Sequence, residues 1–383
     1  MRVMISCGEP SGDLYAGALA AEILRSDPSA DIVGFGGDCL EAAGATLVQN
    51  FSGLSVTGLL EVVRVLPKTY ATYRRLVADA DTRRPDVFVA IDFPDFNFTL
   101  ARALKKRGIP IVYYISPQLW AWRSGRMATM KRLVDRVLVI FPFEEQIYRD
   151  AGVPVEFVGH PLFDVAPQTA PREQFLQRIG FDPSRPVVAL LPGSRANELR
   201  AILPDLAQSA RLIREQVPDT QFIVARAPHL AGELFEPIRR VMRGDAGIVV
   251  TDGQADDVLA AADAAVVASG TATVQAALHG CPMVVVYRLS PITYRLGKPF
   301  VRVDTYAMPN LVAGRRVVPE LIQSAFTPGA VATEAVRMLS DREYVDRMRR
   351  DLGEVRKKLG GRGASRRAAD AVRRVAGHLS AVG

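Results

Sequence analysis

The chain is 383 residues long, which predicts two or three domains at the usual size of about 100–200 residues each. Hydrophobic residues make up 49% and charged residues 23%, a globular composition that excludes a disordered, collagen-like or coiled-coil protein. Three scattered cysteines exclude a disulfide framework, and the four histidines are too dispersed for a metal site. The net charge of +7 suits an anionic partner, but no basic segment studded with aromatics indicates nucleic acid.

Short apolar runs alternate with helical patterns along the first half of the chain. The helical spacing is clearest at 15–24 and 100–106, and the runs predict strands at 3–6, 32–35, 87–91, 111–115 and 137–141. Continuous Val and Ile runs separated by helices are typical of a parallel sheet that is covered on both faces. The same alternation restarts in the second half, where it predicts strands at 187–191, 222–225, 248–251, 265–268 and 283–287.

These patterns predict an α/β fold of two doubly wound, Rossmann-like domains. A Pro/Ala linker at 166–171 separates them, and the chain after about residue 328 is helical and highly charged. We expect domains at 1–165 and 166–345. Residues 346–383 are expected to form a helical extension, which can pack back on the first domain.

Two segments bear on targeting and on membrane spanning. The apolar run at 1–7 is too short for the core of a signal peptide. The 24 residues at 264–287 carry no formal charge and are long enough to cross a bilayer. Their glycines, proline and hydroxyl residues instead predict a buried strand, a tight loop, a short helix and another strand.

Ligands of parallel sheets bind beyond the carboxyl ends of the strands, so the loops after predicted strands are the candidate sites. After the first strand, Glu9 and Ser11 suit sugar hydroxyls better than phosphate, although Ser11 can also simply cap a helix. After the strand at 87–91, Asp92 and Asp95 can have pKa values pushed apart, which suits one of them as a general base; either can instead cap a helix.

Aromatic side chains follow the strand at 111–115. Both tryptophans of the chain, Trp120 and Trp122, lie there beside Arg123. They can form an apolar wall for a ligand or a membrane, or they can pack in the core.

The loops of the second half suit phosphate. Gly193, Ser194 and Arg195 can clamp a diphosphate, because glycine permits close approach and arginine pairs with phosphate in a fork. The segment 269–273 can form an anion nest at a helix N-terminus. Asn310, in a Pro/Gly-bounded loop, is a pocket contact or a turn residue. There is no P-loop or HExxH motif, and the only Asp-x-Asp, at 79–81, precedes a strand, so phosphate neutralisation falls to Arg195 and helix termini.

Six segments together resemble the lipid-A-disaccharide synthases, a family of bacterial glycosyltransferases with the two-domain GT-B architecture. They occur in the family's order from residue 8 to 315 and are GEPSGD at 8–13, PDVFVAIDFPDFN at 85–97, YISPQLWAWR at 114–123, LPGSRANE at 191–198, SGTATVQ at 269–275 and PNLVAGR at 309–315.

The resemblance implies transfer of 2,3-diacylglucosamine from UDP to 2,3-diacylglucosamine 1-phosphate. The products are a β-1,6-linked disaccharide 1-phosphate and UDP, formed with inversion during lipid A synthesis for the Gram-negative outer membrane. It implies no metal and no organic cofactor.

The resemblance also implies roles for individual residues. Asp95 is our choice of general base, with Asp92 as the alternative and Glu9 beside them in the catalytic group. The UDP and donor site is expected to comprise Gly193, Ser194, Arg195, Glu198, Ser269, Gly270, Thr271, Ala272, Thr273, Gln275 and Asn310. The acceptor site is expected to comprise Ser11, Gly12, Asn97, Ser116, Trp120, Trp122 and Arg123.

One position departs from the family pattern. Where the family usually has Glu, this chain has Gln275, and in related GT-B enzymes that Glu accepts hydrogen bonds from the ribose hydroxyls. A glutamine oxygen can still accept, but as a neutral and weaker partner. We therefore expect a lower nucleotide affinity with function retained.

Acylated substrates imply work at a membrane surface. The segment 59–76 mixes apolar residues with Arg64, Lys68, Arg74 and Arg75, and together with the tryptophans it can meet anionic lipid; it can equally be a core-facing pair of amphipathic helices. We expect a cytoplasmic protein bound peripherally to the inner membrane, and terminal helices that exchange between protomers would allow a homodimer.

Two other functions remain open. A UDP-N-acetylglucosamine 2-epimerase would use the same scaffold and a similar UDP site without a lipid acceptor, but the segments 92–97 and 116–123 do not resemble that family. A non-catalytic protein that binds nucleotide sugars or lipids would not require a base such as Asp95.

Overall fold

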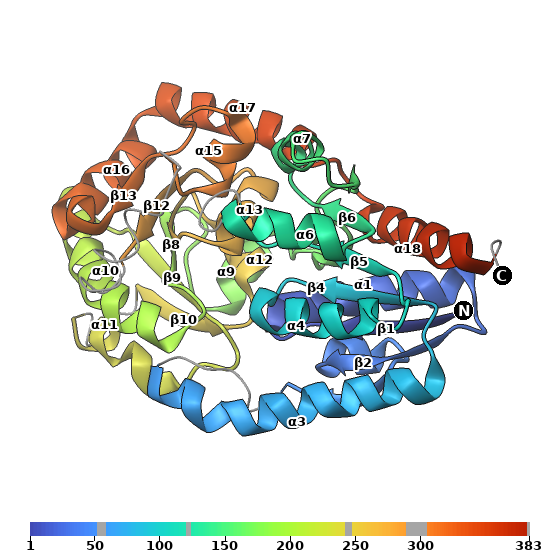
Figure 1. Cartoon of the computed structure of the whole chain (residues 1–383). Coiled ribbons are helices and arrows are strands. Elements are labelled where there is room, and N and C mark those ends of the chain that lie inside the picture. Colours follow the sequence, from blue (N-terminus) through green and yellow to red (C-terminus); the bar gives the residue numbers. More distant parts are fainter. Residues whose placement is uncertain (52–58, 120–123, 242–246, 289–304, 381–383) are drawn as a thin grey trace. The chain divides into compact units, whose positions relative to one another are not determined.

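The structure is a computed structural model that describes residues 1–51, 59–119, 124–241, 247–288 and 305–380 (Figure 1). Of residues 59–66, 124, 241 and 378–380 it describes the backbone alone. The contacts within the chain divide it into two compact units. Unit 1 comprises residues 1–165 and 359–383, and unit 2 comprises residues 166–358.

Within its described residues, unit 1 is built on a seven-stranded parallel sheet of order β3-β2-β1-β4-β5-β6-β7. The strands are β1 (Arg2–Ser6), β2 (Asp31–Gly36), β3 (Thr46–Asn50), β4 (Val87–Ile91), β5 (Ile111–Tyr114), β6 (Arg136–Val139) and β7 (Val155–Phe157). The helices are α1 (Pro10–Ser26), α2 (Asp38–Ala42), α3 (Leu59–Arg83), α4 (Pro94–Lys105), η1 (Ser124–Arg126), α6 (Met127–Leu133), α7 (Pro142–Asp150), α8 (Leu162–Val165) and α18 (Ala364–Ser380).

The described part of unit 2 is built on a six-stranded parallel sheet of order β10-β9-β8-β11-β12-β13. The strands are β8 (Val187–Leu191), β9 (Gln221–Arg226), β10 (Ile248–Asp252), β11 (Ala264–Ala268), β12 (Met283–Tyr287) and β13 (Glu320–Ile322). The helices are α9 (Arg172–Arg178), α10 (Ala196–Gln216), η2 (Gly232–Phe235), α11 (Glu236–Val241), α12 (Ala255–Ala261), α13 (Thr271–Leu278), α15 (Met308–Ala313), η4 (Gln323–Ala325), α16 (Pro328–Ser340) and α17 (Arg342–Lys358).

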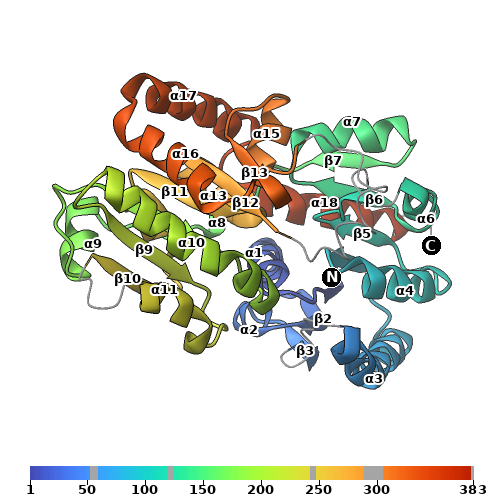
Figure 2. The same cartoon turned by 90° about the vertical axis from the view of Figure 1, so that its left-hand side faces the viewer.

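The predicted fold class is confirmed. Figures 1 and 2 show helices on both faces of each sheet, and the central strands β4, β8 and β11 are accordingly buried along their whole length. This double burial explains why the central strands are unbroken apolar runs in the sequence. The edge strands β3, β7 and β13 are only partly buried and carry polar residues, and the apolar pattern did not predict them. The fourth edge strand, β10, is also partly buried, but its apolar run at 248–251 was predicted.

The uncharged segment 264–287 forms β11, a tight turn, α13 and β12, as predicted. No helix within the described residues combines the length and the apolar character that spanning a membrane requires.

The expected boundary at 345/346 falls inside a helix and differs from the observed division. Helix α17 runs from residue 342 to 358 and stays in unit 2, because its buried face packs against α13, α15 and α16. That face consists of Val345, Met348, Leu352 and Val355. The chain enters unit 1 only at residue 359, and α18 then packs against α1.

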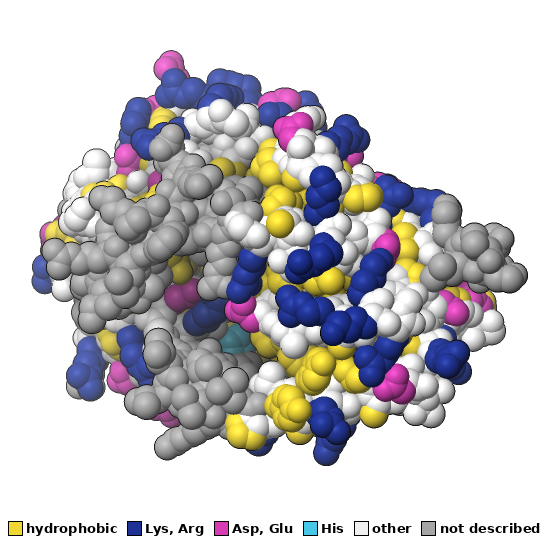
Figure 3. Space-filling model, viewed as in Figure 1, with side chains coloured by type: hydrophobic (Ala, Val, Ile, Leu, Met, Phe, Trp, Pro, Cys, Tyr) yellow, Lys and Arg dark blue, Asp and Glu magenta, His cyan; other side chains and the backbone are white. Residues whose placement is uncertain are grey.

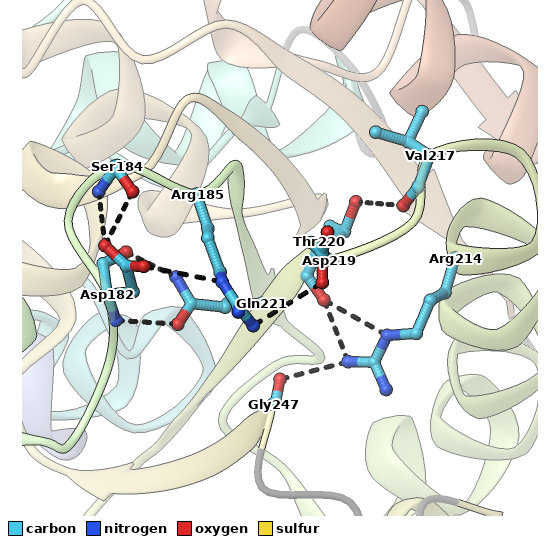
Figure 4. Close-up of polar contacts among 9 residues, drawn as sticks. All are labelled: Asp182, Ser184, Arg185, Arg214, Val217, Asp219, Thr220, Gln221 and Gly247. Carbon is cyan, nitrogen blue, oxygen red and sulfur yellow. Dashed lines mark hydrogen bonds and ion pairs between the residues drawn. The ribbon is translucent and has the colours of Figure 1, made fainter.

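Side-chain hydrogen bonds join the segments that precede β8, β9 and β10, at the amino ends of these strands in unit 2 (Figure 4). The side chain of Gln221 accepts from the Asp182 amide at 2.9 Å and donates to the Asp182 carbonyl at 2.8 Å. Arg214 donates to the carbonyls of Thr220 and Gly247. These polar groups are occupied in joining β8, β9 and β10, which leaves ligand chemistry to the opposite edge of the sheet.

A buried histidine lies near the end of β7 in unit 1. His160 is 2% exposed and packs edge-on against Tyr15 and obliquely against Phe141. Its Nδ1 accepts from the Leu162 amide at 3.2 Å, so the imidazole is the neutral Nε2–H tautomer. Burial lowers the pKa of His160 from 6.5 to about 3.

This histidine predicts a loss of stability in mild acid. Below the unfolded pKa of about 6.5 the unfolded chain takes up a proton that the folded chain excludes, so stability falls as the pH drops from 6.5 toward 3. At pH 5 this group costs about 2 kcal/mol relative to pH 7.5. In urea unfolding at both pH values, the His160→Gln variant, which keeps an acceptor but cannot titrate, should show a pH dependence smaller by that amount. If the free energy of unfolding had the same pH dependence in the wild type and the variant, the prediction would be contradicted.

Candidate active site

Each sheet has one point where the strand order reverses, and the candidate residues follow the strands at these two points. In unit 1 the reversal lies between β1 and β4, and in unit 2 it lies between β8 and β11. At such a point the two adjacent helices leave on opposite faces, which opens a crevice outside the carboxyl ends of the strands. The loops after β1 and β4, and those after β8 and β11, are the ones that the sequence analysis selected.

The loop after β4 has a backbone conformation that is rare outside glycine. Asp92 and Phe93 have φ angles of 44° and 47°, in the left-handed region. Two buried side chains hold this turn: Asn97 Nδ2 donates to the Asp92 carbonyl at 2.8 Å, and the Tyr113 hydroxyl donates to the same oxygen at 2.7 Å. Strain that neighbouring groups fix in this way is typical of functional sites.

Asn97 occupies a different place from the one expected. We expected it to contact a sugar, but its side chain is fully buried. Its Oδ1 accepts from the Ser6 hydroxyl at 2.7 Å, and its Nδ2 also reaches the carbonyls of Ser6 and Ile91, both at 3.2 Å. Asn97 therefore joins the ends of β1 and β4 and positions the loop.

Asp95 carries the accessible carboxylate of this loop. Its side chain is 76% exposed, in the first turn of α4, whereas Asp92 is partly buried. Asp95 forms an ion pair with Arg126, whose guanidinium also lies 6.0 Å from the centre of the Phe98 ring. The arginine thus orients an exposed carboxylate at the carboxyl end of β4, where the acceptor hydroxyl of a substrate could reach it.

The loop after β1 divides into an exposed and a structural part. Glu9 is the N-cap residue of α1, and Ser11 and Gly12 lie in its first turn, so Ser11 is not the cap. Asp13 is 4% exposed and accepts from the amides of Gly37, Cys39 and Leu40. Asp13 therefore fixes the start of α2, and Glu9 and Ser11 remain the partly exposed groups of the loop.

The expected acceptor residues after β5 are only partly described. Ser116 is 7% exposed, and its hydroxyl lies 2.6 Å from that of Tyr148. This burial places Ser116 beneath the loop surface and disagrees with direct contact to a sugar. Trp120, Trp122 and Arg123 lie outside the described residues.

In unit 2, the loop after β8 combines a glycine, a cation and a helix N-terminus. Gly193 has a φ of 113°, and a Cβ there would lie 2.6 Å from Glu198 Oε2. Glu198 is 16% exposed and accepts from Arg195 at 3.3 Å, while Arg195, the N-cap of α10, is 57% exposed. Burial, and then the negative charge of Glu198, raises the pKa of Tyr287 at the end of β12. Glu198 thus orients Arg195, and its contact with UDP stays a prediction.

A histidine that sequence analysis did not select supports the same loop. His229, which follows β9, places Nε2 at 2.8 Å from the Ser194 carbonyl. Ser194 itself is exposed and precedes the N-cap of α10.

The loop after β11 is a second helix N-terminus at the neighbouring strand. Gly270 has a φ of 149° and is exposed, and α13 begins with Thr271 and Ala272. The Thr273 hydroxyl donates to the Gly270 carbonyl at 2.7 Å, and the Ser269 hydroxyl donates to the Tyr306 carbonyl at 3.1 Å. Because β8 and β11 are paired, the N-termini of α10 and α13 follow adjacent strand ends.

Asn310 was also expected in the site and lies elsewhere. It is 1% exposed; its Oδ1 accepts from the amides of Val317 and Val318, and its Nδ2 donates to Glu320 at 2.7 Å. Glu320 in turn accepts from the Tyr306 and Ala307 amides. Asn310 therefore holds the chain segment to which Ser269 is bonded, rather than contacting a nucleotide.

Several residues of the site were missed by the sequence analysis. Tyr113, Arg126, His229 and Glu320 each act on a loop from another element of the chain, so no local pattern could have identified them. Among the described residues, no three His, Cys, Asp or Glu side chains gather closely enough to hold a metal ion.

Comparison with known protein families identifies relatives along nearly the whole chain. The family profile described as lipid-A-disaccharide synthetase matches residues 3–375. The lipid-A-disaccharide synthase of Geobacter metallireducens is 44% identical over 374 residues, which cover 97% of this chain and 96% of that protein. The synthase of Myxococcus xanthus is 42% identical over 371 residues, with 97% and 96% covered.

Solved structures share the fold. The S. aureus MnaA–UDP co-structure matches with a TM-score of 0.68 at 12% identity, covering 97% of this chain and 96% of that one. The glycotransferase of kitacinnamycin matches with a TM-score of 0.63 at 20% identity, covering 98% of each chain. At these identities the likeness shows the fold alone, which is the GT-B architecture expected from the sequence.

Proposed function

This chain belongs to the lipid-A-disaccharide synthase family, and we propose that it joins UDP-2,3-diacylglucosamine to 2,3-diacylglucosamine 1-phosphate through the loops described above. The acceptor 6-hydroxyl attacks the anomeric carbon of the donor from the face opposite UDP. The new C–O bond forms as the bond to the UDP oxygen breaks, which inverts the anomeric carbon. The products are the β-1,6-linked disaccharide 1-phosphate and UDP.

The observation that carries this proposal is the pair of helix N-termini at the reversal point of unit 2. The starts of α10 and α13 follow the paired strands β8 and β11, and Arg195 adds an exposed cation. A diphosphate gains negative charge as it leaves, and fixed amides and a guanidinium stabilise that charge in the transition state. Gly193, which is partly buried, and Gly270, which is exposed, have no side chain to keep the phosphates from the backbone.

The acceptor hydroxyl must also lose a proton. Asp95 is the exposed carboxylate of the loop that Asn97 and Tyr113 hold, and it forms an ion pair with Arg126. We assign it as the base, with Asp92 as the alternative, and we assign contact with sugar hydroxyls to Glu9 and Ser11. Asn97 acts as a positioning residue.

The acyl chains of both substrates place the reaction at a membrane surface, and a face of unit 1 suits that setting. Figure 3 shows Lys and Arg side chains, with apolar side chains between them, over α4 and α6. Exposed cations on or directly after these two helices include Arg102, Lys106, Arg107, Lys131 and Arg132. On α3, Tyr70 is 61% exposed and stacks on Tyr73, beside the exposed Lys68 and Arg74. We therefore propose peripheral binding to the anionic cytoplasmic leaflet.

The exposed cations of α3 predict a loss of vesicle binding. Each basic residue near an anionic surface contributes about 1 kcal/mol, so the Lys68→Ala/Arg74→Ala variant should bind phosphatidylserine vesicles roughly 30-fold more weakly than the wild type. Sedimentation with vesicles measures this. The matched control, Arg356→Ala/Lys357→Ala on α17, removes the same charge from unit 2. An equal loss in both variants would reject α3 as the contact.

One assay tests the proposed function against both alternatives. The purified protein is incubated with the acylated donor and acceptor, and products are identified by mass spectrometry. A parallel reaction with UDP-N-acetylglucosamine is followed by proton NMR, because 2-epimers have the same mass. We expect the disaccharide 1-phosphate and UDP, with no turnover when the acceptor is omitted. Conversion of UDP-N-acetylglucosamine to its 2-epimer would indicate the epimerase alternative. Nucleotide-sugar binding without any product would indicate a non-catalytic binding protein.

A further inference from the structure

The side chain of Gln275 on α13 contacts a carboxylate on the neighbouring helix α12. Its Nε2 lies 3.4 Å from Asp256 Oδ2, and the other oxygen of that carboxylate lies 2.8 Å from Nε2 of His279. Asp256 is in the first turn of α12. Its carboxylate therefore connects α12 to Gln275 on α13 and to His279, the C-cap residue of α13, one turn later. The side chains of Asp256 and His279 are only 15% and 16% exposed.

This arrangement fixes which way the glutamine amide faces. A carboxylate accepts hydrogen bonds and donates none, so only the NH₂ arm of the amide can face Asp256. The carbonyl arm then points away from the carboxylate and presents an acceptor. His279 holds Asp256 from the other side, and the neighbouring Asp257 is engaged elsewhere, since it accepts from the Ala170 amide at 2.8 Å.

The same contact accounts for glutamine at a position where the family resemblance led us to expect glutamate. A glutamate at 275 would bring two carboxylates to the distance that now separates Nε2 from Oδ2. Like charges that close repel, and one of them would be driven to the protonated form. Gln275 and Asp256 are therefore a compatible pair, whereas glutamate would require a different residue at 256.

We propose that Asp256, held by His279, is a positioning residue that orients the Gln275 carbonyl oxygen to accept from the ribose hydroxyls of the nucleotide. This rests on the proposed function, which places UDP at the starts of α10 and α13. The glutamine then retains ribose recognition through orientation, without the charge that a glutamate would supply.

Calorimetric titration with UDP and with 2′,3′-dideoxy-UDP tests the proposal. The wild type should prefer UDP by roughly 10-fold, the size expected for one or two neutral hydrogen bonds. In Asp256→Ala that preference should nearly vanish while the affinity for the dideoxy compound stays constant, which also shows that the variant is folded. Asp257→Ala, which removes the adjacent carboxylate, should keep the full preference.

Variants that move the negative charge from position 256 to position 275 provide a second test. Gln275→Glu alone should weaken UDP binding several-fold, because it opposes Asp256, and Gln275→Glu/Asp256→Asn should restore or exceed the wild-type affinity. Tighter UDP binding by Gln275→Glu alone, an unchanged preference in Asp256→Ala, or a wild type indifferent to the ribose hydroxyls would each overturn the proposal. A wild type that binds no UDP would instead overturn the proposed function itself.

Discussion

Replacing Asp95 with Asn is expected to lower the rate of disaccharide formation by about 10²–10⁴-fold, the contribution typical of a general base. Asparagine keeps the size of the side chain but cannot take the proton of the acceptor hydroxyl. The UDP affinity should be unchanged, because the proposed nucleotide loops belong to unit 2. Steady-state kinetics together with UDP titration separates the two effects.

The matched control for this substitution is Asp81→Asn. Asp81 is also exposed and also paired with an arginine of unit 1, Arg107, but it lies near the end of α3. Its replacement should leave turnover intact. If Asp95→Asn were as active as Asp81→Asn and Asp92→Asn were inactive, the base would be Asp92.

Replacing Arg195 with Ala is expected to lower kcat by about 10²–10³-fold, the loss typical when one preorganised donor to a developing anion is removed. The leaving diphosphate would then rely on the amides of α10 and α13 alone. Glu198, which now pairs with Arg195 at 3.3 Å, would also remain near Gly193 without its cation. Single-turnover measurements report the chemical step directly.

Arg200→Ala is the control for this second prediction. Arg200 is exposed on the same helix and donates to Asn197 at 3.1 Å, so its removal changes the net charge equally. A loss of kcat in Arg200→Ala as large as that in Arg195→Ala would indicate a general charge effect and contradict a specific diphosphate contact.

The fold class, the family and the positions of the functional loops could be predicted from the sequence. Strands buried on both faces must be apolar throughout, so runs such as 187–191 mark both the sheet and the point where each functional loop begins. The resemblance that those loops carry is confirmed by relatives that are more than 40% identical over almost the whole chain.

The orientation of individual side chains could not be predicted from the sequence. Asn97 and Asn310 lie in motifs with the residue types of ligand contacts, yet both are buried and bonded to the backbone of neighbouring segments. Their partners come from turns and strands that meet only in the folded chain. Likewise, the effect of Gln275 depends on Asp256, which lies 19 residues away on another helix.

The central claim is direct displacement at the anomeric carbon by a hydroxyl that a carboxylate deprotonates. The most direct test is the configuration of the new glycosidic bond, measured by proton NMR on the product of wild-type turnover from the α-linked UDP donor. We expect a β-1,6 linkage, the outcome of one inverting displacement. An α linkage would require two displacements or a front-side attack, and it would contradict direct displacement of UDP by the acceptor hydroxyl.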